Sequence, residues 1–548
     1  MTCVGCVVKS QENRLSSPRL GAPAPRLPAW RTGPGWGEVR AVVAWVFLSW
    51  FFLGALPERL CAAQSRIDVI LWFDTEDYLL PADDDACLRL AKMLTERHIR
   101  ATFKVVGEKA RVLERRGRRD VISALKQHAI GYHANFHSVH PTPTEYEADC
   151  GLVDGMAEFA RREGGGAADV RRVFGVSTLV CYGQPGSSWA AQAIAALPQI
   201  GVAPHGTPCY VDEGTHVGLN EQPFWYAGTL NVYHMGENYT RMELHDPTAV
   251  EPAKERVSSI AKRLAARGGG LISIFYHPCE WVHQQFWDGV NFSRGANPPR
   301  EAWKPPPQRP PEETEAAFKR FAEYIDYIRA IPDVHFVTAG DLPTLYPDPV
   351  RAGELSQKDL AKITSGLLAS STNGIDFQVV DNRAYSPADQ FELLVAAVAA
   401  LADGRHVRLP LAAKGLLGPD NLPPSDNSPR HVDWPAFRDT TLDVLNFIQA
   451  QHRVPARVFF GADPVAPADF LIALAQVYDF HERQGALPLR EGVELPCQVE
   501  VLTAKHVAQD TPELFGGWII HKEGFRAPKV MEMARLQAWT LKPAIRKP

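Results

Sequence analysis

The sequence predicts an α/β fold, with a (β/α) barrel over residues 65–348 and a smaller, mostly helical domain after it. Apolar runs such as IDVILWF at 67–73 are continuous, which is typical of parallel strands covered on both faces. Strand-like and helix-like stretches alternate to about Val337, and this rhythm indicates a parallel sheet or barrel. A segment of roughly 280 residues also has the usual size of such a barrel.

The expected elements of the barrel follow one another in a regular order. After the first strand, aspartates open a helix over about 83–97. A second strand at 101–106 (ATFKVV) precedes a helix at 108–128. Near the end of the segment, a proline-rich loop leads into a helix at 312–330 and a last strand and turn at 335–345. Each element therefore supports the same strand–helix repeat.

Composition narrows the class of protein further. The chain has 548 residues, of which 45% are hydrophobic and 22% charged, as in ordinary globular proteins. This length predicts two or three domains. The net charge of −5 does not support a nucleic-acid partner, because such proteins carry a basic excess.

The N-terminal extension, residues 1–64, contains an uncharged apolar stretch at 41–56 (AVVAWVFLSWFFLGAL). Arg31 and Arg40 precede it, and small residues up to Ala63 follow it. This pattern predicts an export signal cut near Ala63, and so a periplasmic or extracellular protein. The stretch is shorter than the roughly 20 residues that span a membrane, so a membrane anchor is the alternative.

Two related units are expected within residues 354–500. The segments 385–389 (YSPAD) and 465–469 (VAPAD) each open a helical pattern. A helical stretch and a short β-like stretch precede each of them, the latter at 377–380 and 456–460. We therefore expect a tandem repeat of two helix–strand–helix units.

Both units resemble pseudomurein-binding-type repeats, in which S-P-A-D/E opens the second helix. The resemblance implies a module that binds the cell wall. The alternative is a helical accessory domain without affinity for glycans. Residues 501–548 carry no pattern that assigns them to either domain.

The first motif of chemical interest is FDTEDY at 73–78, at the end of the first strand. In α/β barrels the C-terminal ends of the strands carry the active site. Asp74, Glu76 and Asp77 would repel one another there, and a bound cation would relieve that repulsion. The alternative is that Asp74 or Asp77 only caps the next helix.

The second motif is HAIGYHANFHSVHP at 128–141, which holds four histidines. His133 and His137 are four residues apart, and on a helical turn both rings would lie on one face and could share an ion. His140 competes with this assignment, because it follows His137 by three residues.

The third motif is LISIFYHPCEW at 271–281, an apolar strand that ends in His277. A histidine at such a strand end can supply a proton at neutral pH. The alternative is a turn residue without chemistry. Trp281 and Trp287 follow this strand and are the aromatic residues expected in a cleft, where they could stack on a sugar.

Together these segments resemble the motifs of the polysaccharide deacetylases with NodB homology, the family-four carbohydrate esterases. ATFKVVGE at 101–108 is similar to the family's ATFFVVGE strand, and HAIGYHANFH resembles H-E-I-G-N-H-[ST]-x-x-H. The resemblance implies a deformed (β/α) barrel of the glycoside hydrolase/deacetylase type. It also implies a divalent metal ion, commonly Zn²⁺, and an N-acetylated glycan substrate such as peptidoglycan or chitin.

The resemblance also implies a role for each site residue. Asp74 would take a proton from water, and His277 would give one to the departing amine. The metal ligands would be Asp77, His133 and His137. The ion would lower the pKa of water from about 16 toward 7, and backbone N–H groups near 182–186 would help to stabilise the oxyanion.

Three departures from the family pattern are visible. Ala134 replaces the usual Ser or Thr after the first metal histidine. The first motif is longer than FDD, so Glu76 is the alternative to Asp77 as a ligand. The motif R-x-P-x-G falls at 181–188 (CYGQPGSS), where Gly183 stands in place of the arginine that would orient the base.

Two other functions stay open, and the missing arginine motivates the first of them. The chain could be a wall-binding protein whose deacetylase site has decayed. It could also hydrolyse a different non-peptide C–N bond, because related barrels act on such bonds.

Overall fold

Parallel strands dominate the main sheet. The computed structural model describes residues 65–351, 355–370, 373–405, 413–425 and 429–547. Within them, ten strands form one sheet in the order β16-β6-β7-β5-β4-β3-β2-β1-β8, with β9 also paired to β1. These are β1 (Arg66–Thr75), β2 (Thr102–Val105), β3 (Ala129–Tyr132), β4 (Cys181–Tyr182), β5 (Cys209–Val211), β6 (Phe224–Tyr226), β7 (Thr229–Val232), β8 (Gly269–Tyr276), β9 (Val334–Val337) and β16 (Lys542–Pro543).

β1 is the centre of this sheet. It pairs in parallel with β2, β8 and β9, and all of its residues after Arg66 are buried. The register sets Asp74 beside Lys104 of β2, so both side chains lie on the same face. The antiparallel strands β6 and β16 make the barrel irregular. The prediction of a deformed (β/α) barrel is confirmed.

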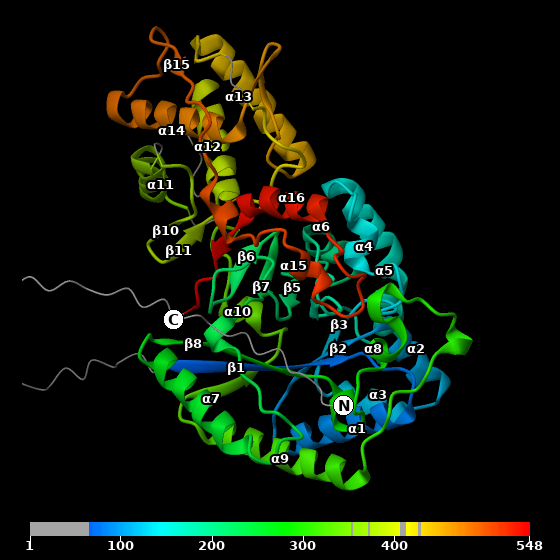
Figure 1. The fold of residues 1–548 in the computed structure, drawn as a ribbon. Coiled ribbons are helices and arrows are strands. Elements are labelled where there is room, and N and C mark those ends of the chain that lie inside the picture. The colour runs from blue at the N-terminus through cyan, green and yellow to red at the C-terminus, as the bar shows by residue number, and fades with distance from the viewer. Residues whose placement is uncertain (1–64, 352–354, 371–372, 406–412, 426–428, 548) are drawn as a thin grey trace, which may run out of the picture. The chain divides into compact units, whose positions relative to one another are not determined.

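Helices cover the sheet, as the alternating pattern predicts. α7 (Val250–Ala265) packs on β1 and β8, and α9 (Pro311–Ala330) packs on α7 and β9 (Figure 1). The expected first helix is α1 (Pro81–Glu96). The single helix expected at 108–128 is wrong. Gly117, in the left-handed conformation with φ 67°, separates two short helices there. They are α2 (Gly107–Arg115) and α3 (Arg119–Leu125).

The two C-terminal units are built alike, but each predicted single strand is a two-stranded hairpin. The first unit consists of α11 (Gln357–Ser370), β10 (Gln378–Val380), β11 (Arg383–Tyr385) and α12 (Pro387–Ala402). The second consists of α13 (Trp434–Gln451), β13 (Val458–Phe460), β14 (Asp463–Val465) and α14 (Pro467–Gln484). Ser386 and Asp389 cap α12 through reciprocal hydrogen bonds. Cell-wall binding by these units stays a prediction.

The unassigned tail packs onto the barrel. It contains α15 (Pro512–Gly516) and α16 (Pro528–Gln537), and β16 extends the main sheet by pairing with β6. Phe515, Met531 and Leu541 lie in the same apolar core as the barrel strands. The tail is therefore a structural part of the barrel.

The predicted export segment at 41–56 lies outside the described residues. Among the helices that the structure describes, none combines the length and the apolar character needed to span a membrane.

The position of the tail predicts the effect of truncating one of its side chains. Met531 is fully buried, so Met531→Ala should lower the free energy of unfolding by about 2–5 kcal/mol. Ile519, which is 58% exposed, provides the control, and Ile519→Ala should change it by less than about 0.5 kcal/mol. Urea unfolding measures both. Equal midpoints for the two variants would show that the tail is not part of the core.

Candidate active site

The ends of the parallel strands bring the candidate residues together. Glu76 directly follows β1, His133 directly follows β3, and His277 directly follows β8. Because parallel strands end at the same edge of the sheet, these three side chains meet although they are far apart in the sequence.

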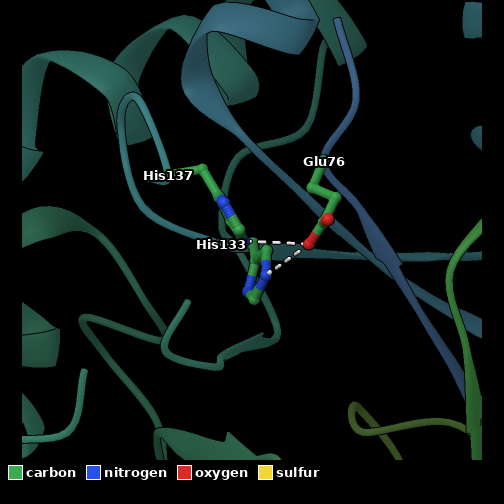
Figure 2. A group of neighbouring side chains, drawn as sticks. All are labelled: Glu76, His133 and His137. Atoms are coloured by element: carbon green, nitrogen blue, oxygen red, sulfur yellow. Dashed lines mark ion pairs between the residues drawn. The ribbon is translucent and has the colours of Figure 1, made fainter. Parts of the chain in front are cut away.

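Glu76, His133 and His137 form a buried triad. Oε2 of Glu76 lies 2.8 Å from Nε2 of His137 and 3.6 Å from Nε2 of His133. Figure 2 shows the carboxylate directed at both rings. This is a set of ligand atoms that could hold one metal ion.

Hydrogen bonds fix the tautomers of both histidines. Nδ1 of His133 donates to the carbonyl oxygen of Gly183 over 2.9 Å, because a carbonyl can only accept. The Ser138 hydroxyl donates to Asp288, so its oxygen accepts from Nδ1 of His137, 2.6 Å away. Each Nε2 therefore carries a lone pair that faces Glu76. Metal-binding histidines are held in this way.

The donor set fits a divalent cation. Nε2 of His137 is buried and has no hydrogen-bond partner among the described residues. Its lone pair faces an oxygen of Glu76, which would be repulsive unless a proton or a cation lies between them. Two imidazoles and one carboxylate are ligands that Zn²⁺ accepts, and three protein ligands leave a position for water.

Burial also sets the charge states of the triad. It lowers the pKa of His133 well below its usual value and that of His137 to about 4, so both rings are neutral at pH 7. Burial likewise raises the pKa of Glu76 well above its usual range. A divalent cation bound there would lower the pKa of Glu76 again and favour its ionised carboxylate.

Asp77, the predicted acidic ligand, points elsewhere. Its Oδ2 lies 2.9 Å from Nδ1 of His283, and its Oδ1 accepts the N–H of Leu79 over 2.7 Å. Side chains alternate along a strand, so Asp74 and Glu76 share a face while Asp77 lies on the other. The geometry therefore supports Glu76, the alternative that the sequence left open, and not Asp77.

The two histidines do not meet on a helical turn, and that expectation is wrong. No helix is formed between His133 and His137. Ala134 and His137 adopt left-handed conformations, with φ 64° and 59°, and these reverse the chain. Such residues cost about 1–3 kcal/mol each, a strain that is often found at functional sites. His140 lies apart from the triad, 2.7 Å from Glu145.

Asp74 lies next to the triad and is held by charged neighbours. Its Oδ1 is 2.9 Å from Nζ of Lys104 and 3.3 Å from Nδ1 of His133. Burial opposes its ionisation, but His133, Lys104 and His277 outweigh this effect and lower the pKa of Asp74. Asp74 is therefore an ionised carboxylate that can accept a proton.

His277 has the opposite character. Its Nε2 lies 3.6 Å from Oδ2 of Asp74, and its Nδ1 lies 2.7 Å from Glu280, which pairs with Arg241. Burial disfavours the imidazolium, but the carboxylates of Glu76, Glu280 and Asp74 outweigh it. They raise the pKa of His277 to about 9. At neutral pH the ring is protonated and can donate.

The expectation that Trp281 lines a cleft is wrong, whereas Trp287 lies beside His137, with ring centroids 6.0 Å apart, but has no exposed face. Both are completely buried. Trp281 packs in the core against Tyr276 and Phe321. Phe286, which follows β8, is 40% exposed, and its ring lies edge-on to that of His277 at 4.9 Å.

The tail contributes a second aromatic side chain that the sequence did not reveal. Trp518, which is half-buried, lies edge-on to His137 with ring centroids 6.0 Å apart. Its indole covers Gly186 so closely that a Cβ there would lie 2.2 Å from it. Ser187 donates to the backbone of Phe515, and this bond holds the segment in place.

Comparisons with known proteins find similar structures but no similar sequence. No family model and no curated protein matches the chain. A protein from Mycobacterium smegmatis described as a polysaccharide deacetylase is 16% identical, with a TM-score of 0.33, over 54% of this chain and 93% of its own. A second with that description, from Pseudomonas aeruginosa PAO1, is 12% identical, with a TM-score of 0.32, over 51% and 91%. A CE4 esterase from Streptococcus mutans is 14% identical, with a TM-score of 0.27, over 50% and 87%.

The geometry predicts which acidic residue binds metal. Removing a residue that only hydrogen-bonds to a metal ligand commonly lowers the metal affinity by about 10–100-fold. Glu76 is itself a proposed ligand, so Glu76→Gln should lower the affinity at least tenfold. Asp77→Asn is the matched control. It should keep the affinity within about threefold but lower the melting temperature, because it disturbs a buried contact with His283. Chelator competition with Zn²⁺ measures the affinity. The opposite ranking of the two variants would make Asp77 the ligand.

Proposed function

We propose that the chain is a metal-dependent deacetylase that removes N-acetyl groups from an extracellular or cell-wall polysaccharide. The observation that carries this proposal is one arrangement of side chains. The triad of Glu76, His133 and His137 lies within 4.0 Å of both an ionised carboxylate, Asp74, and a protonated imidazole, His277. These are the groups that metal-assisted hydrolysis of an amide requires.

The two catalytic groups have complementary tasks. When bound, a divalent cation such as Zn²⁺ would lower the pKa of water and polarise the acetamide carbonyl. Asp74 takes a proton from the water while the oxygen of that water attacks the carbonyl carbon of the acetamide. His277 gives a proton to the amine nitrogen as the C–N bond breaks. The products are acetate and a free amino sugar.

The separation of the two pKa values supports this division of roles. Asp74 and His277 are 3.6 Å apart, yet the pKa of Asp74 is lowered and that of His277 is raised to about 9. Paired groups whose pKa values are driven apart are typical of an acid and a base in one site. At neutral pH each side chain is therefore in the state that its role needs.

The substrate and location are part of the proposal. Phe286 and Trp518 offer aromatic faces close to His277 and His137, and such faces pack against the apolar side of a sugar ring. The units within 354–500 would hold the enzyme on its polymer. The apolar stretch at 41–56 would direct export or anchor the chain in a membrane.

Catalysis predicts large effects of single substitutions. Asp74→Asn and His277→Ala should each lower kcat by about 10²–10⁴-fold, the usual contribution of a general base or acid. His137→Ala should abolish Zn²⁺-dependent turnover, and the neighbouring variant His140→Ala, outside the triad, should retain it. Acetate release from chitin oligomers and peptidoglycan is the measurement.

The same assay separates the competing functions. A protein that holds one Zn²⁺ per chain but releases no acetate from these glycans, and hydrolyses small cyclic amides instead, would be a different C–N hydrolase. A protein that binds the wall with neither metal nor turnover would be the decayed enzyme. Full activity of a His133→Ala, His137→Ala double variant would contradict the site assignment.

A further inference from the structure

A lysine is buried beside the proposed base. Lys104, in β2, has a completely buried side chain whose Nζ lies 2.9 Å from Asp74 and 2.9 Å from Asp212. Nζ also donates to the backbone oxygen of Val211 over 2.7 Å and lies 4.1 Å from the ring centroid of Trp72. Lysine is rarely buried without such partners, because desolvating its charge is costly. The ammonium therefore has a fixed position between two carboxylates.

Gly183 leaves open the space that this lysine takes. A Cβ at Gly183 would lie 2.0 Å from Nζ of Lys104, 2.5 Å from Oδ2 of Asp212 and 2.6 Å from the backbone oxygen of Val211. Gly183 does not have a positive φ, so its backbone conformation does not require glycine. The close packing of Lys104, Asp212 and Val211 around it does.

The lysine also accounts for a second group of possible metal ligands. Asp74, His133 and Asp212 offer ligand atoms close to one another. The ammonium of Lys104 already pairs with both carboxylates of that group, so their charge has a partner within the protein. Among the described residues, no such ammonium pairs with Glu76 of the triad. The two groups therefore differ in whether the protein itself supplies a positive charge.

We propose that Lys104 is the positioning residue for Asp74, in the space that Gly183 leaves open beside it. The proposal rests on the proposed deacetylase function. Lys104 binds Oδ1 of Asp74 and leaves Oδ2, the oxygen 3.6 Å from His277, to take the proton. Asp212, whose Oδ1 accepts the N–H of Glu213, anchors the ammonium from the opposite side. The base is thus oriented from β2 and not from the loop after β4.

Lys104→Met and Lys104→Arg test this role against the wild type. Lys104→Met should lower kcat by about 100-fold with little change in KM, because a base misplaced by about 1 Å costs that much. Lys104→Arg keeps a positive charge beside Asp74, so its kcat should exceed that of Lys104→Met at least tenfold.

Zn²⁺ content provides a reading that is independent of turnover. Lys104→Met should still bind one Zn²⁺ per chain, because among the described residues no hydrogen bond or ion pair joins Lys104 to Glu76, His133 or His137. If it does not fold, Lys104→Met/Asp212→Asn, which removes the second buried charge as well, takes its place.

The outcomes distinguish this inference from the function on which it rests. If the wild type releases no acetate, the proposed function is wrong. An active wild type with a folded, Zn²⁺-bound Lys104→Met variant of unchanged kcat overturns the role of Lys104. A folded, Zn²⁺-bound Lys104→Arg variant that is no more active than Lys104→Met overturns the role of the positive charge.

Discussion

Three carboxylates lie at the end of β1 or directly after it, and all three are buried where an unpaired charge is costly. The structure meets this constraint by giving each one a different partner. Asp74 pairs with Lys104, and Asp77 lies 2.9 Å from His283. Glu76 faces imidazoles that burial keeps neutral. A cation at the triad would be the partner that completes the set.

Strand geometry determines which carboxylate goes where. The parallel neighbours of β1 end at the same edge, so His133 and His277 arrive there as the first residues after β3 and β8. Asp212, the first residue after β5, arrives in the same way. The site is therefore a consequence of sheet topology, and only His137 depends on a strained loop.

Much of this could be predicted from the sequence, because it depends on local patterns. Continuous apolar runs and their alternation with helices predict the barrel, and strand ends identify the histidines. The sequence could also have decided between Glu76 and Asp77, since the period of two along a strand separates Asp74 and Glu76 from Asp77. The conformation of the loop from His133 to His137 could not be predicted, because left-handed residues other than glycine leave little trace in a sequence.

Long-range packing explains what remained hidden. Trp281 is buried because α9 covers it, and Trp518 reaches the site because the tail packs into the barrel core. Lys104 is the clearest case. In ATFKVV it interrupts an apolar strand, and Gly183 alone looks like the loss of an arginine. Only the fold shows that Lys104 lies beside Asp74, in the space that a side chain at 183 would enter.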